Sequence, residues 1–451
     1  MQGDHSSLTP EPTTASAMKL LLTAAALAFT LSAHATNWPQ WRGPSLDGTS
    51  PEKDLPLHWS AEKGVKWKTP LPAFSGATPA IWGDSIFVTS PDANKNLLLL
   101  CLKKSDGSIR WQKPLAEGDI NKGKGNMASP SPVTDGKTVW VLFGTGDLVA
   151  LDFQGHILWR RSLAADYGKF AIMWIYGSSP LLYEGRLYVQ VLQRSPAPED
   201  YPGLGGTGGE RESYLLALDP QTGKSLWKQV RKTTAVIESM ESYATPVPHK
   251  VGGKTQILVL GGDCLTGHDS ATGKELWRGY GVNPKSGQFM RIVPSPVSAG
   301  ELAIVCGPKK EAMLAFRTDL TGDITESGLV WKFDEKRTPD VCTPVYANGR
   351  LYALDGDSHT LTCFHAKTGE KIWQGEVPER GTVIRASPTL ADGRLYIVNE
   401  RGSAHVVDAT ADEFKILATN VLPDENVRGS IAVSDGCLFI RGAQYLYCIG
   451  K

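Results

Sequence analysis

Several patterns that carry chemistry in other proteins are missing from this sequence of 451 residues. Its seven cysteines show neither the Cys-x-x-Cys spacing of zinc sites nor the Cys-x-x-Cys-His motif of attached haem. Its nine histidines form no His-x-His or His-Glu-x-x-His group, and the Gly-x-Ser-x-Gly motif of hydrolases does not occur. The sequence therefore offers no support for a metal site, an attached haem or a nucleophilic serine.

A surplus of one charge is also missing. The 47 Lys and Arg residues balance 47 Asp and Glu residues. Proteins that bind nucleic acid or an anionic membrane surface through charge carry a basic excess. We therefore expect neither nucleic acid nor an anionic membrane among the partners of this protein.

The apolar run at residues 20–31 is shorter than the roughly 20 residues that a membrane-spanning helix needs. It follows Lys19 and ends at Ala33-His34-Ala35, which is the pattern of a secretory signal peptide. We expect residues 1–17 to be an extension upstream of the true start and residues 18–35 to be a signal peptide that is removed. The mature protein is then periplasmic or secreted, with no membrane span.

What the sequence does contain is a repeat marked by a Ser/Thr-Pro pair. The copies are 43 to 66 residues apart, which suits a four-stranded propeller blade better than a helical repeat of about 34 residues. The last copy, Ser430-Ile431, lacks the proline. The other copies are Thr78-Pro79, Ser131-Pro132, Ser179-Pro180, Thr245-Pro246, Ser295-Pro296, Thr343-Pro344 and Ser387-Pro388.

The interior of each repeat predicts four strands. An Asp-Gly or Asn-Gly pair, such as Asp392-Gly393, forms a tight hairpin turn between apolar runs. A third run often ends in Leu-Asp, and a Thr-Gly turn then leads into a fourth strand that carries a tryptophan. The tryptophans of this set are Trp111, Trp159, Trp227, Trp277, Trp331 and Trp373.

The eighth repeat ends at Lys451 after three strands, and the segment Val65–Leu71 has the character of the missing fourth strand. We therefore predict an all-β, eight-bladed propeller of four-stranded antiparallel blades over residues 64–451, with its ring closed by an N-terminal strand. Residues 36–63 form a Trp/Pro/Gly-rich arm before the first blade. Its aromatics either dock on the propeller or stack against a ligand.

The combination of Ser/Thr-Pro, Gly-Arg-Leu-Tyr, Leu-Asp, Thr-Gly and Trp resembles the repeat of the pyrroloquinoline quinone (PQQ) propeller family, the quinoprotein-like propellers. The resemblance covers about residues 64 to 451. It implies a fold shared by PQQ-dependent dehydrogenases and by non-catalytic relatives similar to the outer-membrane assembly lipoprotein, so the fold alone selects no function. Alcohol dehydrogenases of this family carry adjacent cysteines against the cofactor, and no two cysteines are adjacent in this sequence.

Strand order predicts where a site would lie. The Asp-Gly and Thr-Gly turns share one face of the ring, whereas the blade-to-blade connections and the longer turns share the other. Variable loops on a rigid scaffold are where function concentrates, and the insertion at residues 193–213 is expected to overhang this mouth of the channel. The residues that precede each Ser/Thr-Pro pair at the mouth are Phe74, Met127, Trp174, Tyr176, Glu238, Glu241, Tyr243, Arg291, Asp340, Arg385 and Arg428.

From this set we predict a binding site for an anionic, planar or polyhydroxylated ligand, because arginines, acids and aromatics converge on one axis. The alternative is that charged groups at a wet channel mouth pair with one another. The predicted site consists of Trp174, Tyr176, Glu241, Arg291, Asp340, Arg385 and Arg428.

Two functions remain open. The first is a binding or scaffold propeller of the cell envelope, a monomer whose partner is a small-molecule ligand or an envelope protein. The second is a PQQ-dependent dehydrogenase of alcohols or sugars, for which the resemblance implies PQQ with calcium as cofactors and Trp174 as a stacking platform. The missing adjacent cysteines favour the first.

One cysteine pair stands out near the C-terminus. A turn centred on Gly442-Ala443 is expected to place Cys437 opposite Cys448. An oxidising compartment would allow a disulfide between them. The other five cysteines are interpreted as small buried hydrophobic residues.

Overall fold

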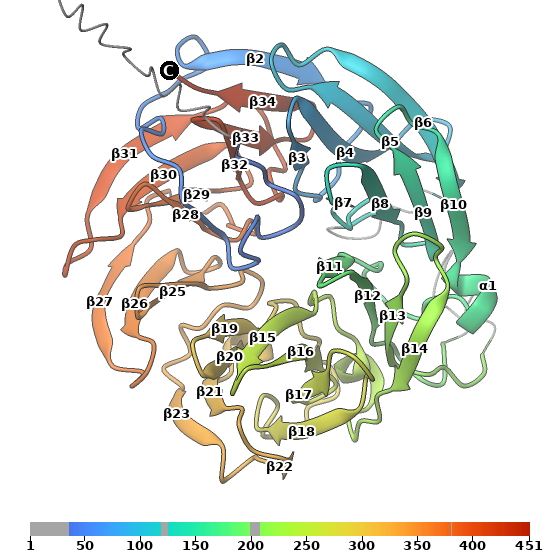
Figure 1. Cartoon of the computed structure of the whole chain (residues 1–451). Coiled ribbons are helices and arrows are strands. Elements are labelled where there is room, and N and C mark those ends of the chain that lie inside the picture. The colour runs from blue at the N-terminus through green and yellow to red at the C-terminus, as the bar shows by residue number, and fades with distance from the viewer. Residues whose placement is uncertain (1–35, 119–124, 199–207, 380) are drawn as a thin grey trace, which may run out of the picture. The chain divides into compact units, whose positions relative to one another are not determined.

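The computed structural model describes residues 36–118, 125–198, 208–379 and 381–451. The predicted extension at residues 1–17 and the predicted signal peptide at 18–35 lie outside these ranges. The strands of the described residues form eight sheets, which stand side by side as the blades of a propeller (Figure 1). The prediction of an all-β, eight-bladed propeller is confirmed.

In each blade the strands follow one another from the channel outward, except in the last blade. Blade 1 consists of β3 (Ala80–Trp82), β4 (Ser85–Pro91), β5 (Asn96–Lys103) and β6 (Ile109–Glu117). Blade 2 consists of β7 (Val133–Thr134), β8 (Thr138–Leu142), β9 (Asp147–Asp152) and β10 (Ile157–Ser162). Blade 3 consists of β11 (Leu181–Tyr183), β12 (Arg186–Val191), β13 (Tyr214–Leu218) and β14 (Ser225–Val230). Blade 4 consists of β15 (Val247–Val251), β16 (Lys254–Gly261), β17 (Cys264–Asp269) and β18 (Glu275–Tyr280).

The second half of the ring repeats this order. Blade 5 consists of β19 (Val297–Ala299), β20 (Leu302–Cys306), β21 (Met313–Arg317) and β23 (Leu329–Phe333). Blade 6 consists of β24 (Val345–Ala347), β25 (Arg350–Asp355), β26 (Thr360–His365) and β27 (Lys371–Glu376). Blade 7 consists of β28 (Thr389–Ala391), β29 (Arg394–Val398), β30 (Ser403–Asp408) and β31 (Ile416–Val421). Blade 8 consists of β32 (Ala432–Ser434), β33 (Cys437–Arg441), β34 (Tyr445–Ile449) and, as its outer strand, β2 (Val65–Pro70). Two blades gain a fifth, parallel strand, because β1 (Thr49–Ser50) pairs with β28 and β22 (Gly322–Asp323) pairs with β18.

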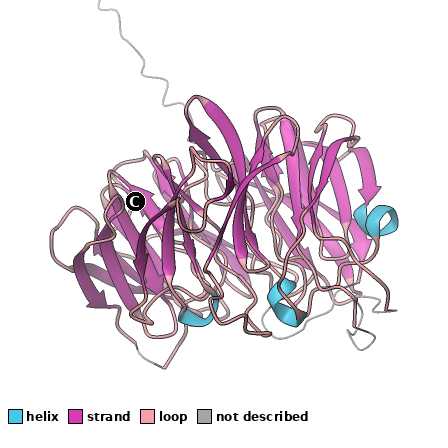
Figure 2. Ribbon diagram, turned by 90° about the horizontal axis from the view of Figure 1, so that it is seen from below, coloured by secondary structure: helices cyan, strands magenta, loops and turns pink. Residues whose placement is uncertain are grey.

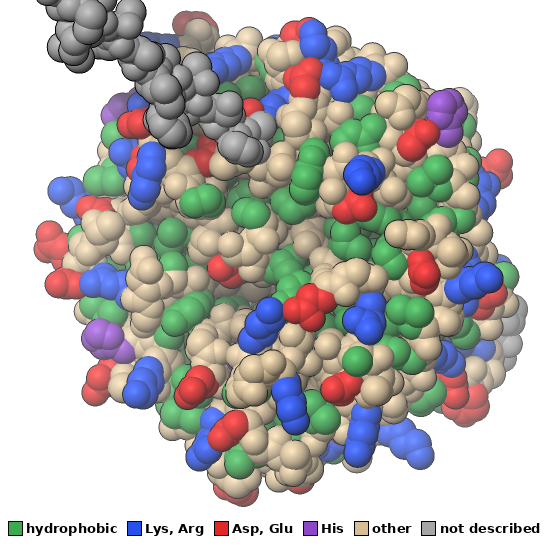
Figure 3. All heavy atoms as spheres, viewed as in Figure 1, with side chains coloured by type: hydrophobic (Ala, Val, Ile, Leu, Met, Phe, Trp, Pro, Cys, Tyr) green, Lys and Arg blue, Asp and Glu red, His purple; other side chains and the backbone are tan. Residues whose placement is uncertain are grey.

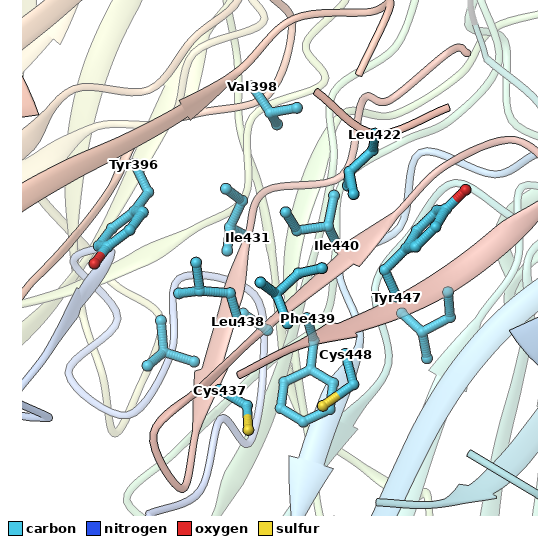
Figure 4. Close-up of a cluster of buried hydrophobic side chains, with 14 of the residues drawn as sticks. Tyr396, Val398, Leu422, Ile431, Cys437, Leu438, Phe439, Ile440, Tyr447 and Cys448 are labelled. Carbon is cyan, nitrogen blue, oxygen red and sulfur yellow. The ribbon is translucent and has the colours of Figure 1, made fainter. Parts of the chain in front are cut away.

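The eighth blade closes the ring as predicted. Its outer strand is β2, which pairs antiparallel with β34 and places Trp67 beside Cys448. Trp67 and the neighbouring strands pack into a hydrophobic cluster that also includes Phe439 and Tyr447 (Figure 4). N- and C-terminal segments therefore share one core, and the blade has no unpaired edge at its third strand.

The Ser/Thr-Pro repeat has a structural role that its position in the fold explains. In one blade after another, the backbone N–H of the Ser or Thr donates a hydrogen bond to the side-chain hydroxyl of the equivalent Ser or Thr in the next blade. Ser131 N–H donates to Ser179 Oγ at 3.0 Å, and Ser430 N–H returns to Thr78 Oγ1 at 3.1 Å. Ser430 thus links the last blade to the first although its unit lacks the proline. Further links of this kind join Thr78 to Ser131, Ser179 to Thr245, Thr245 to Ser295, Ser295 to Thr343 and Thr343 to Ser387.

The repeated Thr-Gly turn and tryptophan form the outer contact between blades. Trp159 of blade 2 donates its indole N–H to Pro220 O at 2.9 Å, and its ring covers Gly223 in the turn of blade 3. A Cβ on Gly223 would lie 2.7 Å from that ring, and the residue has a φ of 68°. Both the close approach and the positive φ require glycine. The same contact recurs between Trp111 and Gly155.

The arm at residues 36–63 crosses the middle of the ring (Figure 1). Trp38 is buried and bridges Ile81 of blade 1, and Gln40 Nε2 donates to Leu182 O of blade 3 at 3.2 Å. Arg42, also buried, donates to the carbonyl oxygens of Pro344 at 2.7 Å and Pro388 at 3.2 Å. Burial lowers the pKa of Arg42 to about 10. The arm thus ties several blades together at the end of the channel opposite the mouth.

The last hairpin differs from its predicted register. The strands β33 and β34 place Phe439, not Cys437, opposite Cys448. The carboxylate of Asp424 accepts hydrogen bonds from the backbone N–H groups of Ala443 and Gln444, at 3.1 Å and 3.2 Å. This interaction moves the centre of the turn by one residue. All seven cysteines, Cys437 and Cys448 included, carry free thiols in this structure.

The face of the molecule that is turned toward the viewer in Figure 1 carries Lys, Arg, Asp and Glu side chains interspersed with apolar ones (Figure 3). This distribution agrees with the balanced charge of the sequence. Within the described ranges, the structure contains no helix that has both the length and the apolar character to cross a membrane.

Candidate functional site

The mouth face is the face at which each blade's innermost strand begins. It is formed by the connections between blades and by the turns between second and third strands. Two short 3₁₀ turns lie on this face: η1 (Ile237–Met240) in the connection from blade 3 to blade 4, and η2 (Pro308–Lys310) in the turn between β20 and β21. Figure 2 shows two helical turns at one face of the ring. The short α1 (Leu163–Tyr167) directly follows β10, at the start of the connection from blade 2 to blade 3.

Arg291 and Asp340 form the best-defined charge pair of the mouth. The two guanidinium NH₂ groups of Arg291 lie 3.0 Å and 2.9 Å from the two carboxylate oxygens of Asp340. The backbone N–H of Lys309, in η2, also donates to Asp340, at 2.6 Å. Although burial opposes it, the hydrogen bonds and charge of Arg291 hold the pKa of Asp340 below its ordinary value. The two predicted residues therefore bind each other across blade connections.

Arg385 and Arg428 pair with acids that the sequence analysis did not select. Arg385 Nη1 lies 3.0 Å from Asp357 Oδ1, and Arg428 Nε lies 2.9 Å from Glu400 Oε1. Each acid stands in the turn between the second and third strands of the preceding blade. Because strand order already placed those turns on the mouth face, acids in them could have been predicted to meet the arginines.

Trp174, Glu241 and their neighbours form a second group. The indole N–H of Trp174 donates to Glu238 Oε1 at 2.9 Å, and its backbone N–H donates to the hydroxyl of Tyr243 at 3.0 Å. Glu241 is fully buried and accepts a hydrogen bond from the backbone N–H of Met173 at 2.8 Å. Trp174 is 41% exposed. Of this group, Trp174 presents the large surface to solvent.

Tyr176 lies apart from the other predicted residues. Its side chain is buried, packs against Phe170 and donates its hydroxyl to Gln190 O at 2.7 Å. Burial raises the pKa of this hydroxyl well above its ordinary value. Tyr176 therefore belongs to the core beneath the mouth. The predicted overhanging insertion falls partly on residues 199–207, which lie outside the described residues.

Exposed apolar side chains surround η1. Trp174, Val236 and Phe289 are 41%, 46% and 54% exposed. The segment that carries Phe289 contacts η1 directly, since Met290 N–H donates to Ser239 Oγ at 2.9 Å. We call Trp174, Val236 and Phe289 the apolar rim.

Two strained residues flank the apolar rim. Ile175 has a φ of 73° and Ile237 a φ of 55°. A positive φ is rare for a β-branched residue and costs about 1–3 kcal/mol. Each isoleucine directly follows a rim residue, so the strained backbone lies next to Trp174 and Val236.

The arginines of the mouth do not fit the anionic quinone that the dehydrogenase alternative implies. In the part of the chain that the structure describes, no three His, Cys, Asp or Glu side chains form a group that could hold a metal ion. The arginines that would bind an anionic quinone are paired with Asp340, Asp357 and Glu400. Paired charges instead join blade connections to one another or to the turn between the second and third strands of the preceding blade.

Comparison with known proteins places this geometry in a family. A family model described as outer membrane protein assembly factor BamB matches residues 57–192, 99–327 and 321–413. The BamB of Bordetella pertussis is 23% identical over 334 residues, which cover 73% of this chain and 72% of that protein.

Solved structures share the fold. The structure of BamB from Moraxella catarrhalis has a TM-score of 0.59 at 15% identity and covers 85% of this chain and 99% of that chain. The quinohemoprotein alcohol dehydrogenase from Comamonas testosteroni has a TM-score of 0.63 at 11% identity, with 92% and 81% covered. Structural likeness at such identities shows the propeller fold alone. The matches of the family model span most of the propeller, and the chain therefore belongs to the PQQ-repeat propeller family described as outer membrane protein assembly factor BamB.

Proposed function

We propose that this protein is an exported scaffold of the cell envelope that binds a protein partner through its mouth face. The observation that carries the proposal is the apolar rim, in which Trp174, Val236 and Phe289 expose large side chains around η1. Exposed apolar surface gathered in one place is typical of protein interaction sites. Membership of a family named for outer membrane protein assembly supports a partner in the envelope.

The paired charges support a protein partner over a small anion. An anion at Arg291 would compete with the bidentate contact of Asp340, whose side chain is only 11% exposed. Removing one member of such a pair leaves the other charge poorly solvated. A partner that covers the apolar rim instead leaves the pair intact and uses it as a polar border, as many protein interfaces do.

Site-specific photo-crosslinking tests the proposal. A photoreactive amino acid placed at Phe289 is expected to crosslink to one or a few envelope proteins in living cells. The matched control is Leu226, which is 49% exposed on the outer strand β14. Crosslinks of equal strength from both positions, or none from Phe289, would contradict the mouth-face interface.

A functional test uses the same surface. Phe289→Glu and Trp174→Ala are expected to lower the amount of folded outer membrane protein in cells that depend on this protein, because they remove apolar contact area. Leu226→Glu is expected to have no effect. The amount of the variant protein in the envelope must be measured in parallel, since a loss of the scaffold itself would mimic a loss of binding.

The dehydrogenase alternative is tested directly with purified protein. Addition of PQQ and calcium is expected to produce no reduction of an artificial electron acceptor with a panel of alcohols and sugars. Turnover that disappears in both Arg385→Ala and Arg291→Ala would overturn the scaffold proposal in favour of the enzyme. Saturable quenching of tryptophan fluorescence without turnover would instead make the mouth a quinone-binding site.

A further inference from the structure

The side chains of Cys437 and Cys448 meet in the blade that closes the ring. Cys437 is the first residue of β33, and Phe439, two residues later, lies opposite Cys448. The two cysteines are therefore diagonal neighbours on one face of the sheet, where both are labelled in Figure 4. The two side chains are close enough for each thiol to shift the pKa of the other.

A lysine lies beside this pair. The residue opposite Cys437 is Gly450, and the point where a Cβ on Gly450 would stand is 2.8 Å from Cys437 Sγ and 2.4 Å from Lys66 Cε. The absence of a side chain at Gly450 therefore allows Lys66 to approach Cys437. Lys66 itself is exposed, whereas only 6% of the surface of Cys437 is exposed to solvent.

The surroundings make the two thiols unequal. Interaction with the Cys448 thiol, together with the charge of Lys66, lowers the pKa of Cys437 although burial opposes this, and the carboxylate of Glu52 opposes it as well. The same interaction and burial raise the pKa of Cys448. A thiolate next to a cation attacks disulfides readily, and a second thiol in reach can complete the exchange.

We propose that Cys437 and Cys448 form a redox-active pair, in which Cys437 attacks an oxidising disulfide and Cys448 resolves the product. The Cys437 thiolate bonds to one sulfur of the oxidant and releases the other as a thiolate. Cys448 then loses its proton to solvent, bonds to the Cys437 sulfur and expels the second thiolate. Two electrons pass from the cysteines to the oxidant, which leaves as two thiols. This chemistry does not depend on the proposed scaffold function.

Oxidation would link β33 to β34, and β34 is the strand to which β2 pairs. A disulfide usually needs Cα atoms about 4.4–6.8 Å apart, and diagonal neighbours are farther apart than opposite ones. Closing the bond therefore draws the first residue of β33 toward β34, next to the turn at Asp435-Gly436. The oxidised blade is expected to resist unfolding better than the reduced one, because the link restricts the unfolded chain.

The test uses the reduced protein of residues 36–451 with oxidised glutathione as the oxidant. The expected product has lost two hydrogens, and peptide mapping links Cys437 to Cys448. Cys448→Ser is expected to accumulate one glutathione on Cys437, whereas Cys437→Ser accumulates none on Cys448. Lys66→Gln is expected to slow the first step, since it removes the charge that favours the thiolate.

Cys363→Ser serves as the matched control, because Cys363 is fully buried on β26 and distant in sequence from the pair. It is expected to oxidise as the unsubstituted protein does. A folded protein that keeps both thiols, a disulfide that involves another cysteine, or a Cys448→Ser variant that forms no glutathione adduct would each overturn the proposal. Because the unsubstituted protein gives the primary result, a variant that fails to fold does not prevent the test.

Discussion

At the scale of single residues, most Ser and Thr residues of the Ser/Thr-Pro pairs perform two tasks. Their N–H groups donate to the next blade and their hydroxyls accept from the preceding one, so Ser179 accepts from Ser131 N–H and donates to Thr245 Oγ1. These groups are buried, and a buried backbone N–H without a partner is costly. The hydrogen bonds thus explain why Ser or Thr, rather than any small residue, marks the repeat.

Ser179→Ala is expected to lower the free energy of unfolding by about 1–3 kcal/mol, because the buried N–H of Ser131 loses its acceptor. The measurement is the urea-induced unfolding transition. The control is Ser327→Ala, at an exposed position, for which a change within about 0.5 kcal/mol is expected. Equal effects of both substitutions would show that the hydrogen bond contributes nothing.

Asp340→Asn is expected to lower the free energy of unfolding by about 1.5–3 kcal/mol at pH 7, since Arg291 loses its charged partner. The pKa of Asp340 is lowered in the folded protein. Its stabilisation is therefore present above the unfolded pKa of about 3.9 and is lost as pH falls through the folded pKa.

The difference between Asp340→Asn and the unsubstituted protein should therefore be large at pH 7 and should shrink in acid, in urea unfolding at a series of pH values. Asp319→Asn is the control, because Asp319 forms an exposed pair with Arg317 and exposed pairs contribute little. A difference that grew on acidification would contradict the assigned direction of the pKa shift.

At the scale of elements, the turn between third and fourth strands and the tryptophan of the preceding blade act as one unit. The glycine of the turn lies under the indole ring, and the indole N–H bonds a carbonyl oxygen of the same turn, as for Trp159 with Gly223 and Pro220. A strand in blade 4 departs from this pattern: Trp277 donates to Gln256 within its own blade, and β22 covers the edge of β18 instead.

Gly223→Ala is expected to destabilise the protein more than Gly185→Ala in the same blade. Both glycines have a positive φ, 68° and 73°, so both substitutions carry the strain of about 1–2 kcal/mol that an alanine meets there. A Cβ at Gly185 meets open space, whereas one at Gly223 would press on Trp159 and add about 1–3 kcal/mol. Urea unfolding and the near-ultraviolet signal of tryptophan measure the difference, and equal costs would rule out the contact as its cause.

At the scale of the whole molecule, the closing strand β2 decides whether the ring is complete. Deleting residues 36–71 removes the arm and β2 and exposes the edge of β34. The truncated protein is expected to aggregate or to lose cooperative unfolding. Deleting residues 36–63 alone removes the arm and keeps β2, and this variant is expected to remain a cooperative monomer of lower stability. Light scattering after size exclusion and thermal unfolding distinguish the two, and identical behaviour would refute closure by β2.

The sequence by itself determined the number of blades, their order and the strand that closes the ring. These features follow from patterns that repeat within some 50 residues: turn residues, alternating apolar runs and a tryptophan at a regular place. Such patterns act through local backbone preferences and through contacts between consecutive units, so they can be read without knowledge of the rest of the fold.

Only the tertiary structure decided the partners at the mouth and the course of the arm. Arg42 bonds a carbonyl oxygen 346 positions away, and Asp424 shifts the turn of the last hairpin from 20 positions away. The sequence placed Arg385 and Tyr176 on one face, yet it could not show that Asp357 would pair with the first or that the second would be buried. A short motif specifies its own backbone conformation, whereas the neighbours of a side chain depend on how distant segments pack.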